Sequence, residues 1–303
     1  MKPTVIILTL NAEKTISLIL SKIDLEKYNI VIIDSSSNDK TLDICRKYDC
    51  YIKTIPKSNF NHGATREMAR KLIDSDIVVF LTQDAISFNR ETIGKLIKPI
   101  REGKASASYA RQILHQNAGI FESFPRLFNY GDKAQIRSIK DIHKYGVYTF
   151  FCPNSCAAWL SSALDEIGGF KPTLTNEDYF ACAELLLKGY KVAYVADAIV
   201  KHSHNYSLAD EFRRMFDTGY VRAERPWIQD AVGNAENRGK AYFLALIKKL
   251  YKENCLLVPY AIIQTAMKYL GYKIGFNALK FPKWIKKFLS GQDYYWYSKY
   301  YQG

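Results

Sequence analysis

The sequence is poor in cysteine and lacks the segments that mark secreted, zinc-binding or repeat proteins. Six cysteines in 303 residues form no Cys-x-x-Cys pair, so neither a disulfide framework nor a zinc site is indicated, and we expect reduced thiols in the cytoplasm. The apolar run after Met1-Lys2-Pro3 is too short for a secretory signal and predicts a strand instead. No internal repeat or low-complexity linker is visible. With 48% hydrophobic residues, the chain has the composition of a globular protein with a core.

Acidic residues are scarce toward the C-terminal end, where positive charge gathers. The whole chain carries a net charge of +13, and residues 240–303 hold eleven lysines against only Glu253 and Asp293, a net charge of +9. Such an excess calls for an anionic partner, which can be nucleic acid, a phospholipid surface or a phosphorylated substrate.

The same region lacks an apolar run long enough to cross a membrane. The run at residues 255–263 falls short of the roughly 20 residues that a bilayer requires. Lysines alternate with aromatic residues at 281–289 and at 294–301, which favours amphipathic helices lying on an anionic membrane surface. A helical subdomain or an oligomer contact, with its lysines solvated, is the alternative.

Unbroken apolar runs separated by helical patterns fill the first hundred residues. The predicted strands lie at residues 5–10, 30–33, 51–55 and 77–81. Such strands are typical of the parallel sheet of an α/β fold, which is covered by helices on both faces and binds ligands beyond the carboxyl ends of its strands. Asn11, Asp34 and Asp84 fall at these ends, so we expect them to converge on one rim of the sheet.

The pattern is less regular in the middle of the chain. Residues 106–151 mix aromatic and charged side chains without a clear period, and we expect a loop or an irregular helical insertion over the rim. Further on, the sequence predicts strands at 155–159 and 192–195, helices at 161–167 and 178–187, and a helical region from residue 208. These patterns predict an α/β domain over residues 1–205 and a mainly helical, basic and aromatic region over 206–303.

Carboxylates and histidines after the predicted strands suggest metal and nucleotide chemistry. Asp84 can hold Mg²⁺ or Mn²⁺ against a diphosphate, although an aspartate at this place can also cap the next helix. His202 and His204 follow a strand, so that one imidazole can join the metal. Asp34 can accept a hydrogen bond from a pyrimidine N3–H. Asp39, in the same serine-rich loop, either caps a helix or faces a ribose, and we favour the cap.

Two further groups open predicted helices. Gly63 permits close backbone approach, and Arg66, one turn later, can reach either a phosphate or a carboxylate. Glu177 and Asp178 are two adjacent carboxylates that the helix dipole stabilises. They are either plain helix-start residues or include a general base that takes a proton from an attacking hydroxyl.

These motifs follow one another in a recognisable order over residues 3–220. They are the Val5-Ile-Ile-Leu-Thr-Leu-Asn11 strand, the Asp34-Ser-Ser-Ser-x-Asp39 loop, the segments at 60–66, 81–85 and 154–158, Glu177-Asp178 and His202-Ser203-His204. The set resembles the family 2 glycosyltransferases with the GT-A fold, and is most similar to the bacterial rhamnosyltransferases that build O-antigen, capsule and rhamnan chains. The most specific motifs are Asn61-His-Gly-x-Thr-Arg66 and Thr82-Gln-Asp-Ala85, where general family 2 enzymes usually show other residues.

The resemblance implies roles for particular residues. Nucleotide-sugar binding would involve Asn11, Asp34, Ser36, Asp39, His62, Gly63, Arg66, Gln83 and Asp84, with Asp34 at the base. Asp84 would be the surviving acid of the family's Asp-x-Asp motif and would bind Mg²⁺ or Mn²⁺ together with His202. Asp178 would be the catalytic base, oriented by Glu177, while Asn154 and Trp159 would contact the acceptor. Because Ala85 follows Asp84 and no second carboxylate comes after it, water would complete the coordination of the metal.

The implied reaction is a transfer with inversion of L-rhamnose from dTDP-β-L-rhamnose, which yields an α-L-rhamnoside. The acceptor would be a saccharide or a polyprenyl-diphosphate-linked saccharide of surface polysaccharide synthesis. Such an acceptor would place the protein in the cytoplasm, peripheral on the inner face of the cell membrane, where an oligomer is possible.

Several alternatives stay open at the level of sequence. A UDP-hexose donor is the alternative within the same class. A non-catalytic scaffold of a polysaccharide-assembly complex is a further alternative, and the missing second acid is its best support. A nucleotidyltransferase would carry a glycine-rich, arginine-containing loop where residues 11–15 read Asn-Ala-Glu-Lys-Thr. A nucleic-acid-binding module would explain the charge, but carboxylates gathered at strand ends would repel a phosphodiester backbone, so we expect no nucleic-acid partner.

Overall fold

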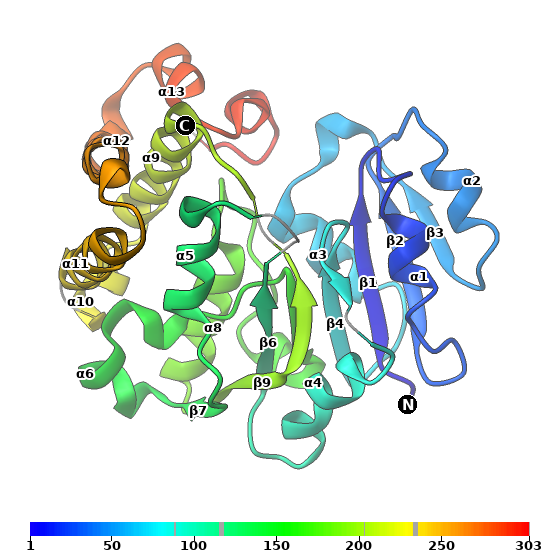
Figure 1. Ribbon diagram of the computed structural model, residues 1–303. Coiled ribbons are helices and arrows are strands. Elements are labelled where there is room, and N and C mark those ends of the chain that lie inside the picture. The colour runs from blue at the N-terminus through cyan, green and yellow to red at the C-terminus, as the bar shows by residue number, and fades with distance from the viewer. Residues whose placement is uncertain (88, 115–117, 203, 233–235, 303) are drawn as a thin grey trace. The chain divides into compact units, whose positions relative to one another are not determined.

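The computed structural model describes residues 1–87, 89–114, 118–202, 204–232 and 236–302 (Figure 1). The chain divides into two units. The first comprises Met1–Lys140, Thr149–Pro172 and Glu177–Ser203, and the second comprises Asp141–Tyr148, Thr173–Asn176 and His204–Gly303.

A β-sheet forms the centre of the first unit. Its strands are Thr4–Thr9 (β1), Asn29–Asp34 (β2), Tyr51–Thr54 (β3), Ile77–Thr82 (β4), Ile86–Ser87 (β5), Ala107–Ile113 (β6), Gln135–Arg137 (β7), Cys156–Leu160 (β8) and Val192–Lys201 (β9). They lie in the order β3-β2-β1-β4-β8-β6-β9-β5, with β7 beside β9. β1 to β4 pair in parallel, as predicted, whereas β8 runs antiparallel between β4 and β6. The α/β fold class is therefore confirmed.

Helices on the two faces of the sheet explain why its strands are apolar without interruption (Figure 1). The helices are Ile16–Leu20 (α1), Thr41–Cys45 (α2), His62–Arg70 (α3), Thr92–Arg101 (α4), Ile120–Asn129 (α5), Ser161–Glu166 (α7) and Glu177–Leu187 (α8). Val79 and Leu81 of β4 belong to a core cluster with residues of α1 and α4. Phe80, between them, points to the other face and meets Phe170, because side chains alternate along a strand. Both faces of β4 are therefore buried.

For residues 106–151 we expected a loop or an irregular helical insertion. The segment does contain a helix, α5, but it also contains the strands β6 and β7, which the sequence pattern did not indicate. β6 is an internal strand that pairs with β8 on one side and with β9 on the other. Because β6 contains polar side chains, the sequence pattern did not indicate a buried strand there. These side chains are nevertheless buried with partners: Ser108 Oγ donates to the Leu96 carbonyl at 2.6 Å, and Gln112 Nε2 donates to Ser155 Oγ at 2.5 Å. Tertiary hydrogen bonds satisfy groups that a half-exposed strand would leave to water.

The second unit is helical, as the pattern after residue 208 predicted. Its helices are Ile142–Tyr145 (α6), Leu208–Glu224 (α9), Trp227–Val232 (α10), Glu236–Glu253 (α11), Val258–Phe276 (α12) and Lys283–Leu289 (α13). Ser207 and Asp210 form a capping box that fixes the start of α9. Within the described ranges, none of the helices combines the length and apolar character needed to span a bilayer.

Close contact between the backbones of α9 and α12 holds the second unit together. A Cβ atom added to Gly275 would lie 2.0 Å from the Phe216 carbonyl oxygen, so only glycine permits this approach. The end of the chain is anchored by Lys286, which is 2% exposed and donates to the Leu279 carbonyl and to the Tyr301 hydroxyl. Lys286 therefore does not belong to the solvated lysine face that the sequence suggested.

We predict that Gly275→Ala lowers stability by about 1–3 kcal/mol, because the added methyl group forces α9 and α12 apart. The urea midpoint of the full chain measures this change. Gly239→Ala is the matched control: Gly239 lies in α11 with no atom within 4 Å of an added Cβ, so this variant should gain about 0.5–1 kcal/mol. Equal midpoints for the two variants would contradict the close packing.

Candidate active site

Strand ends of the first unit surround a cavity of about 610 Å³. It is lined by residues from the loop after β1, the loop before α2 and the end of β4: Asn11, Ala12, Glu13, Lys14, Thr15, Asn38, Asp39, Gln83 and Asp84. The predicted convergence of Asn11 and Asp84 on one rim is therefore observed, and Asp39 and Gln83 join them. Asn11 has a left-handed backbone (φ 52°), and its Oδ1 accepts from Asn38 N at 2.9 Å, which links two of these segments.

Asp34 is not part of the cavity wall, although it stands at the same rim. Its carboxylate is fully buried and accepts hydrogen bonds from Thr9 Oγ1 at 2.9 Å, Ser37 N at 2.8 Å and Ser37 Oγ at 2.6 Å. These three donors all belong to the protein, and the base contact expected for Asp34 stays a prediction. Ser36, with φ 63°, donates to the Ile55 carbonyl and likewise shapes the loop.

Asp39 and Gln83 fix the backbone around the cavity. Asp39 Oδ1 accepts from Thr41 N and Thr41 Oγ1, which stabilises the turn into α2, whereas the N-cap residue of that helix is Lys40. Gln83 Oε1 accepts from Leu10 N at 2.8 Å, while Gln83 Nε2 donates to the Leu10 carbonyl at 3.1 Å. This two-point contact ties the exit of β1 to the end of β4, directly before Asp84.

Asp84 and His202 face each other across the rim. His202 follows β9, and its Nε2 lies 3.5 Å from Asp84 Oδ1. The Asp84 carboxylate is partly exposed, whereas the imidazole is mostly buried. His204 belongs to the second unit, and Ser203 lies outside the described residues. A carboxylate oxygen and an imidazole nitrogen that converge in this way are a suitable pair of ligands for Mn²⁺ or Mg²⁺, so they form a candidate metal site.

Gln112 and Ser155 orient His202, and sequence reasoning missed both. His202 Nδ1 lies 3.0 Å from Gln112 Oε1, and the amide of Gln112 donates to Ser155 Oγ. With the amide nitrogen turned to Ser155, Gln112 Oε1 accepts, so Nδ1 carries a proton and Nε2 is the ring nitrogen that faces Asp84. The sequence offered only a glutamine within a strand. Its contact with His202 cannot be recognised before β6, β8 and β9 are known to be neighbours.

A second polar cluster joins α3 to the start of α8. Arg66 Nη1 donates to Glu177 Oε1, and both side chains are only 6% exposed. Asn154 contacts both carboxylates of the pair, since its Nδ2 lies 3.4 Å from Glu177 Oε1 and its backbone N donates to Asp178 Oδ2 at 2.8 Å. Of the two roles considered for Arg66, the structure gives it the carboxylate and not a phosphate.

The two adjacent carboxyl groups have opposite pKa shifts. Burial opposes ionisation of Glu177, but the positive charge of Arg66, the interaction with His62 and the hydrogen bonds that Glu177 accepts together outweigh burial and hold the pKa of Glu177 below its usual range. Burial and then the negative charge of Glu177 raise the pKa of Asp178 to about 7. Asp178 is only partly buried. It therefore has both the access and the basicity of a general base near neutral pH, which Glu177 lacks.

Other predicted site residues belong to the framework behind this cluster. Gly63 faces the Lys171 carbonyl oxygen, which would lie 2.0 Å from an added Cβ, so its close approach is to protein and not to a ligand. Trp159 is fully buried against Phe170 and donates from Nε1 to Asn154 Oδ1 at 2.8 Å. Both side chains are buried, and the acceptor contacts expected for Asn154 and Trp159 stay predictions.

His62 is a neutral imidazole in the same region. Burial, and then the positive charge of Arg66, lower its pKa to about 4. Its ring packs edge-on against Phe60 at a centroid distance of 4.8 Å. Nothing in these contacts assigns His62 to a nucleotide-sugar.

A mixed sheet with a polar cavity at its rim, a candidate pair of metal ligands and a carboxyl group of raised pKa are together typical of α/β enzymes that transfer groups. The sequence model described as glycosyl transferase family 2 matches residues 4–168, just over half of the chain. The chain belongs to this family and is a glycosyltransferase.

Relatives with assigned roles align over most of the chain. The O-antigen chain rhamnosyltransferase RfbN of Salmonella typhimurium is 37% identical over 302 residues, covering 98% of this chain and 96% of that protein. The O-antigen chain rhamnosyltransferase WbaN of Salmonella anatum is 39% identical over 269 residues, covering 88% and 85%.

Solved structures share the fold at low sequence identity. A mannosyltransferase of Pyrobaculum calidifontis, in complex with GDP-Man and Mn²⁺, superposes with a TM-score of 0.61 at 16% identity and covers 92% of this chain and 88% of its own. Residues 1–349 of TarS from Staphylococcus aureus give a TM-score of 0.54 at 16% identity, with 92% and 91% covered. These likenesses establish the GT-A fold.

We predict that removing the charge of Glu177 moves the pH–rate profile of sugar transfer toward lower pH by about one unit or more, because Glu177 raises the pKa of Asp178. Glu177→Gln alone leaves Arg66 buried without its partner, which costs about 3–5 kcal/mol. The double variant Arg66→Met/Glu177→Gln removes both charges and should keep the fold; its midpoint should fall by less, because Glu177 raises the pKa of Asp178 and Arg66 lowers it by a smaller amount. An unchanged midpoint in a folded Glu177→Gln variant would contradict the electrostatic link.

Proposed function

We propose that this protein transfers L-rhamnose from dTDP-β-L-rhamnose to a saccharide acceptor, carried on polyprenyl diphosphate, during O-antigen synthesis. The near full-length identity of 37–39% to two O-antigen rhamnosyltransferases supports the sugar and the pathway. The observation that carries the catalytic part is the contrast between the paired, buried Glu177 and the accessible Asp178 with its raised pKa.

The proposed reaction is one in-line displacement with inversion at C1 of the rhamnosyl group. An acceptor hydroxyl oxygen forms the new bond to C1 as the bond from C1 to the donor's diphosphate breaks, and the hydroxyl proton passes to Asp178. A β-linked donor then yields an α-L-rhamnoside and dTDP. Asn154 N and Tyr179 N, which donate to the Asp178 carboxylate, hold it in one orientation.

We place the nucleotide part of the donor in the cavity at the strand ends. Asn11, Asp39 and Gln83 line it with groups that can accept or donate hydrogen bonds, and Lys14 adds a positive charge. Asp34 supports the site from behind, through the loop that it shapes. A divalent ion held by Asp84 and His202 would neutralise charge on the leaving diphosphate.

We further propose that residues 1–205 act as the nucleotide-sugar-binding and catalytic part, and residues 206–303 as a contact to the membrane or to a second copy. An acceptor embedded in the inner leaflet would make the protein peripheral on the cytoplasmic face of the cell membrane. The excess of lysine at residues 240–303 supports an anionic surface as its partner.

We predict that the protein transfers sugar from dTDP-rhamnose in preference to UDP-glucose or GDP-mannose, and that Asp178→Asn lowers kcat by about 10²–10⁴-fold. Nucleotide release in a donor panel with a saccharide acceptor measures both. Asp43→Asn, on the surface, is the control and should leave kcat unchanged. Near-normal transfer by a folded Asp178→Asn variant would remove the base assignment, and a preference for UDP-glucose would remove the rhamnosyl assignment.

We predict that Asp84→Asn and His202→Ala each abolish most Mn²⁺ binding, and that Gln112→Met weakens it by about 10–100-fold, because His202 loses the acceptor that fixes its tautomer. Titration calorimetry without donor measures the affinity, and nitrogen NMR of the imidazole reports the tautomer. His143→Ala, in α6, is the control. Unchanged Mn²⁺ affinity in Asp84→Asn would show that the pair does not bind metal.

A further inference from the structure

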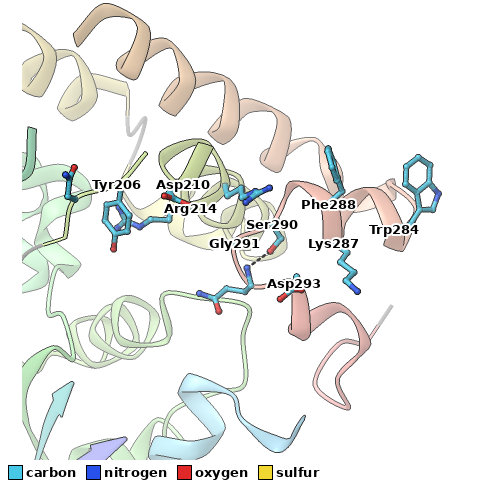
Figure 2. Close-up of a pocket in the computed structure, with 12 residues that line it drawn as sticks. Tyr206, Asp210, Arg214, Trp284, Lys287, Phe288, Ser290, Gly291 and Asp293 are labelled. Atoms are coloured by element: carbon cyan, nitrogen blue, oxygen red, sulfur yellow. Dashed lines mark hydrogen bonds between the residues drawn. The ribbon is translucent and has the colours of Figure 1, made fainter. Parts of the chain in front are cut away.

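A second cavity, of about 920 Å³, lies wholly within the second unit (Figure 2). It is formed by the segment before α9, by one face of α9, by α13 and by the loop that follows α13. Its lining includes three basic residues, Arg213, Arg214 and Lys287, and two large aromatic residues of α13, Trp284 and Phe288. None of these residues has a role in the sugar-transfer site of the first unit.

The aromatic side chains of α13 are exposed to an unusual degree. Trp284 is 67% and Phe288 72% exposed, and their spacing of four residues places them on the same side of the helix. Figure 2 shows the indole of Trp284 extending away from the ribbon of α13. Lys283 and Lys287 have the same spacing, so lysine and aromatic side chains alternate along the outer part of this helix. Transfer of either ring from water into an apolar phase would be favourable, because it removes apolar surface from water.

The basic side chains of the cavity differ in their ion-pair and ring contacts. Arg214 lies over the Tyr206 ring at 4.1 Å and pairs with Glu211 at 3.5 Å. Among the residues that the structure describes, no carboxylate forms an ion pair with Arg213 or with Lys287.

The acidic groups of the cavity leave room for an anion. Asp210 is occupied in the capping box, where its carboxylate accepts from Ser207 N and Ser207 Oγ. Asp293 is the other carboxylate of the lining. Three basic groups against two acidic ones suit a small anionic head group, whereas the two carboxylates would repel a continuous polyanion such as RNA.

The cavity is held in shape by buried contacts beneath it. Asp217 of α9 is 3% exposed and accepts from Ser290 Oγ at 2.6 Å and from Gly291 N at 2.9 Å, so the end of α13 is fixed to α9. Lys286, buried on the inner side of α13, faces the rings of Tyr220, Trp296 and Tyr301. A site fixed in this way loses little freedom when a ligand binds.

We propose that this cavity binds the phosphate head group of an anionic membrane lipid, with Arg213 and Lys287 at the phosphate and with Trp284 and Phe288 entering the acyl layer. The inference deepens the proposed membrane contact of residues 206–303 and names the side chains that make it.

Lys287 Nζ lies 5.2 Å from the Tyr297 ring centroid, and Arg213 is close enough to Asp210 to lower the pKa of that carboxyl group, but neither basic group has an ion-pair partner among the described residues. Aromatic rings beside such basic groups match a lipid surface, which is apolar within and anionic at its face.

Vesicle flotation of the full chain, without any sugar donor, tests the proposal. We expect binding to phosphatidylcholine vesicles that contain phosphatidylglycerol and little binding to pure phosphatidylcholine. Trp284→Ala/Phe288→Ala and Arg213→Gln/Lys287→Gln should each weaken binding by about tenfold or more. The control is Leu244→Ala/Lys248→Gln, which removes an exposed apolar and basic pair of the same spacing from α11 and should leave binding unchanged.

Each other outcome overturns the proposal. Equal loss in the α11 control would mean that the net charge, and not this cavity, binds the surface. Protection of Lys287 from chemical labelling by inorganic diphosphate, without any vesicle binding, would assign the cavity to a free phosphate compound. Binding to a protein partner, without any vesicle binding, would assign the cavity to a contact with that protein. Because no donor is present, a failure here leaves the proposed sugar transfer intact, and a failure of sugar transfer leaves this result standing.

Discussion

The ion pair between Arg66 and Glu177 is the interaction on which the arrangement of the first unit depends. It lies almost entirely out of solvent, where desolvation offsets much of the attraction between the charges, so its value to stability alone is small. The pair instead fixes the positions of the elements that it joins and sets the charge of the neighbouring carboxyl groups. Arg66 also lies over the Phe80 ring, at 5.8 Å from its centroid, so the pair connects α3, β4 and α8 in one contact. Loss of one partner would leave the other buried and uncompensated.

The same pair separates the roles of two neighbouring carboxyl groups. Glu177 is ionised because Arg66 faces it, and its fixed negative charge then makes ionisation of Asp178 less favourable. A catalytic base needs a pKa near the working pH, and the charge next to it provides one without any change in residue type. Asn154 links the two groups by side chain and backbone, and Trp159 holds Asn154 from behind. Buried residues thus support the base.

Sequence reasoning reached the elements whose signal is local. Unbroken apolar runs predicted β1 to β4, polar residues at their ends predicted the rim, and motif order predicted the family. It did not reach features that arise only when distant segments meet. Gln112 and Ser155 became partners of His202 because β6 lies between β8 and β9, an order that no local pattern contains. Asp34 and Trp159 looked like ligand contacts but are buried, since burial depends on the completed core. Lys286 looked solvated for the same reason.

The proposed catalysis depends on Asp178 being a carboxyl group whose charge is set by its surroundings. Carbon-13 NMR of the aspartate carboxyl groups, assigned by comparison with Asp178→Asn, follows its ionisation directly and needs no substrate. We expect Asp178 to titrate with a midpoint near pH 7, well above the ordinary value of about 4. A midpoint at or below about 4 would contradict it, because the two adjacent carboxylates would then be equivalent.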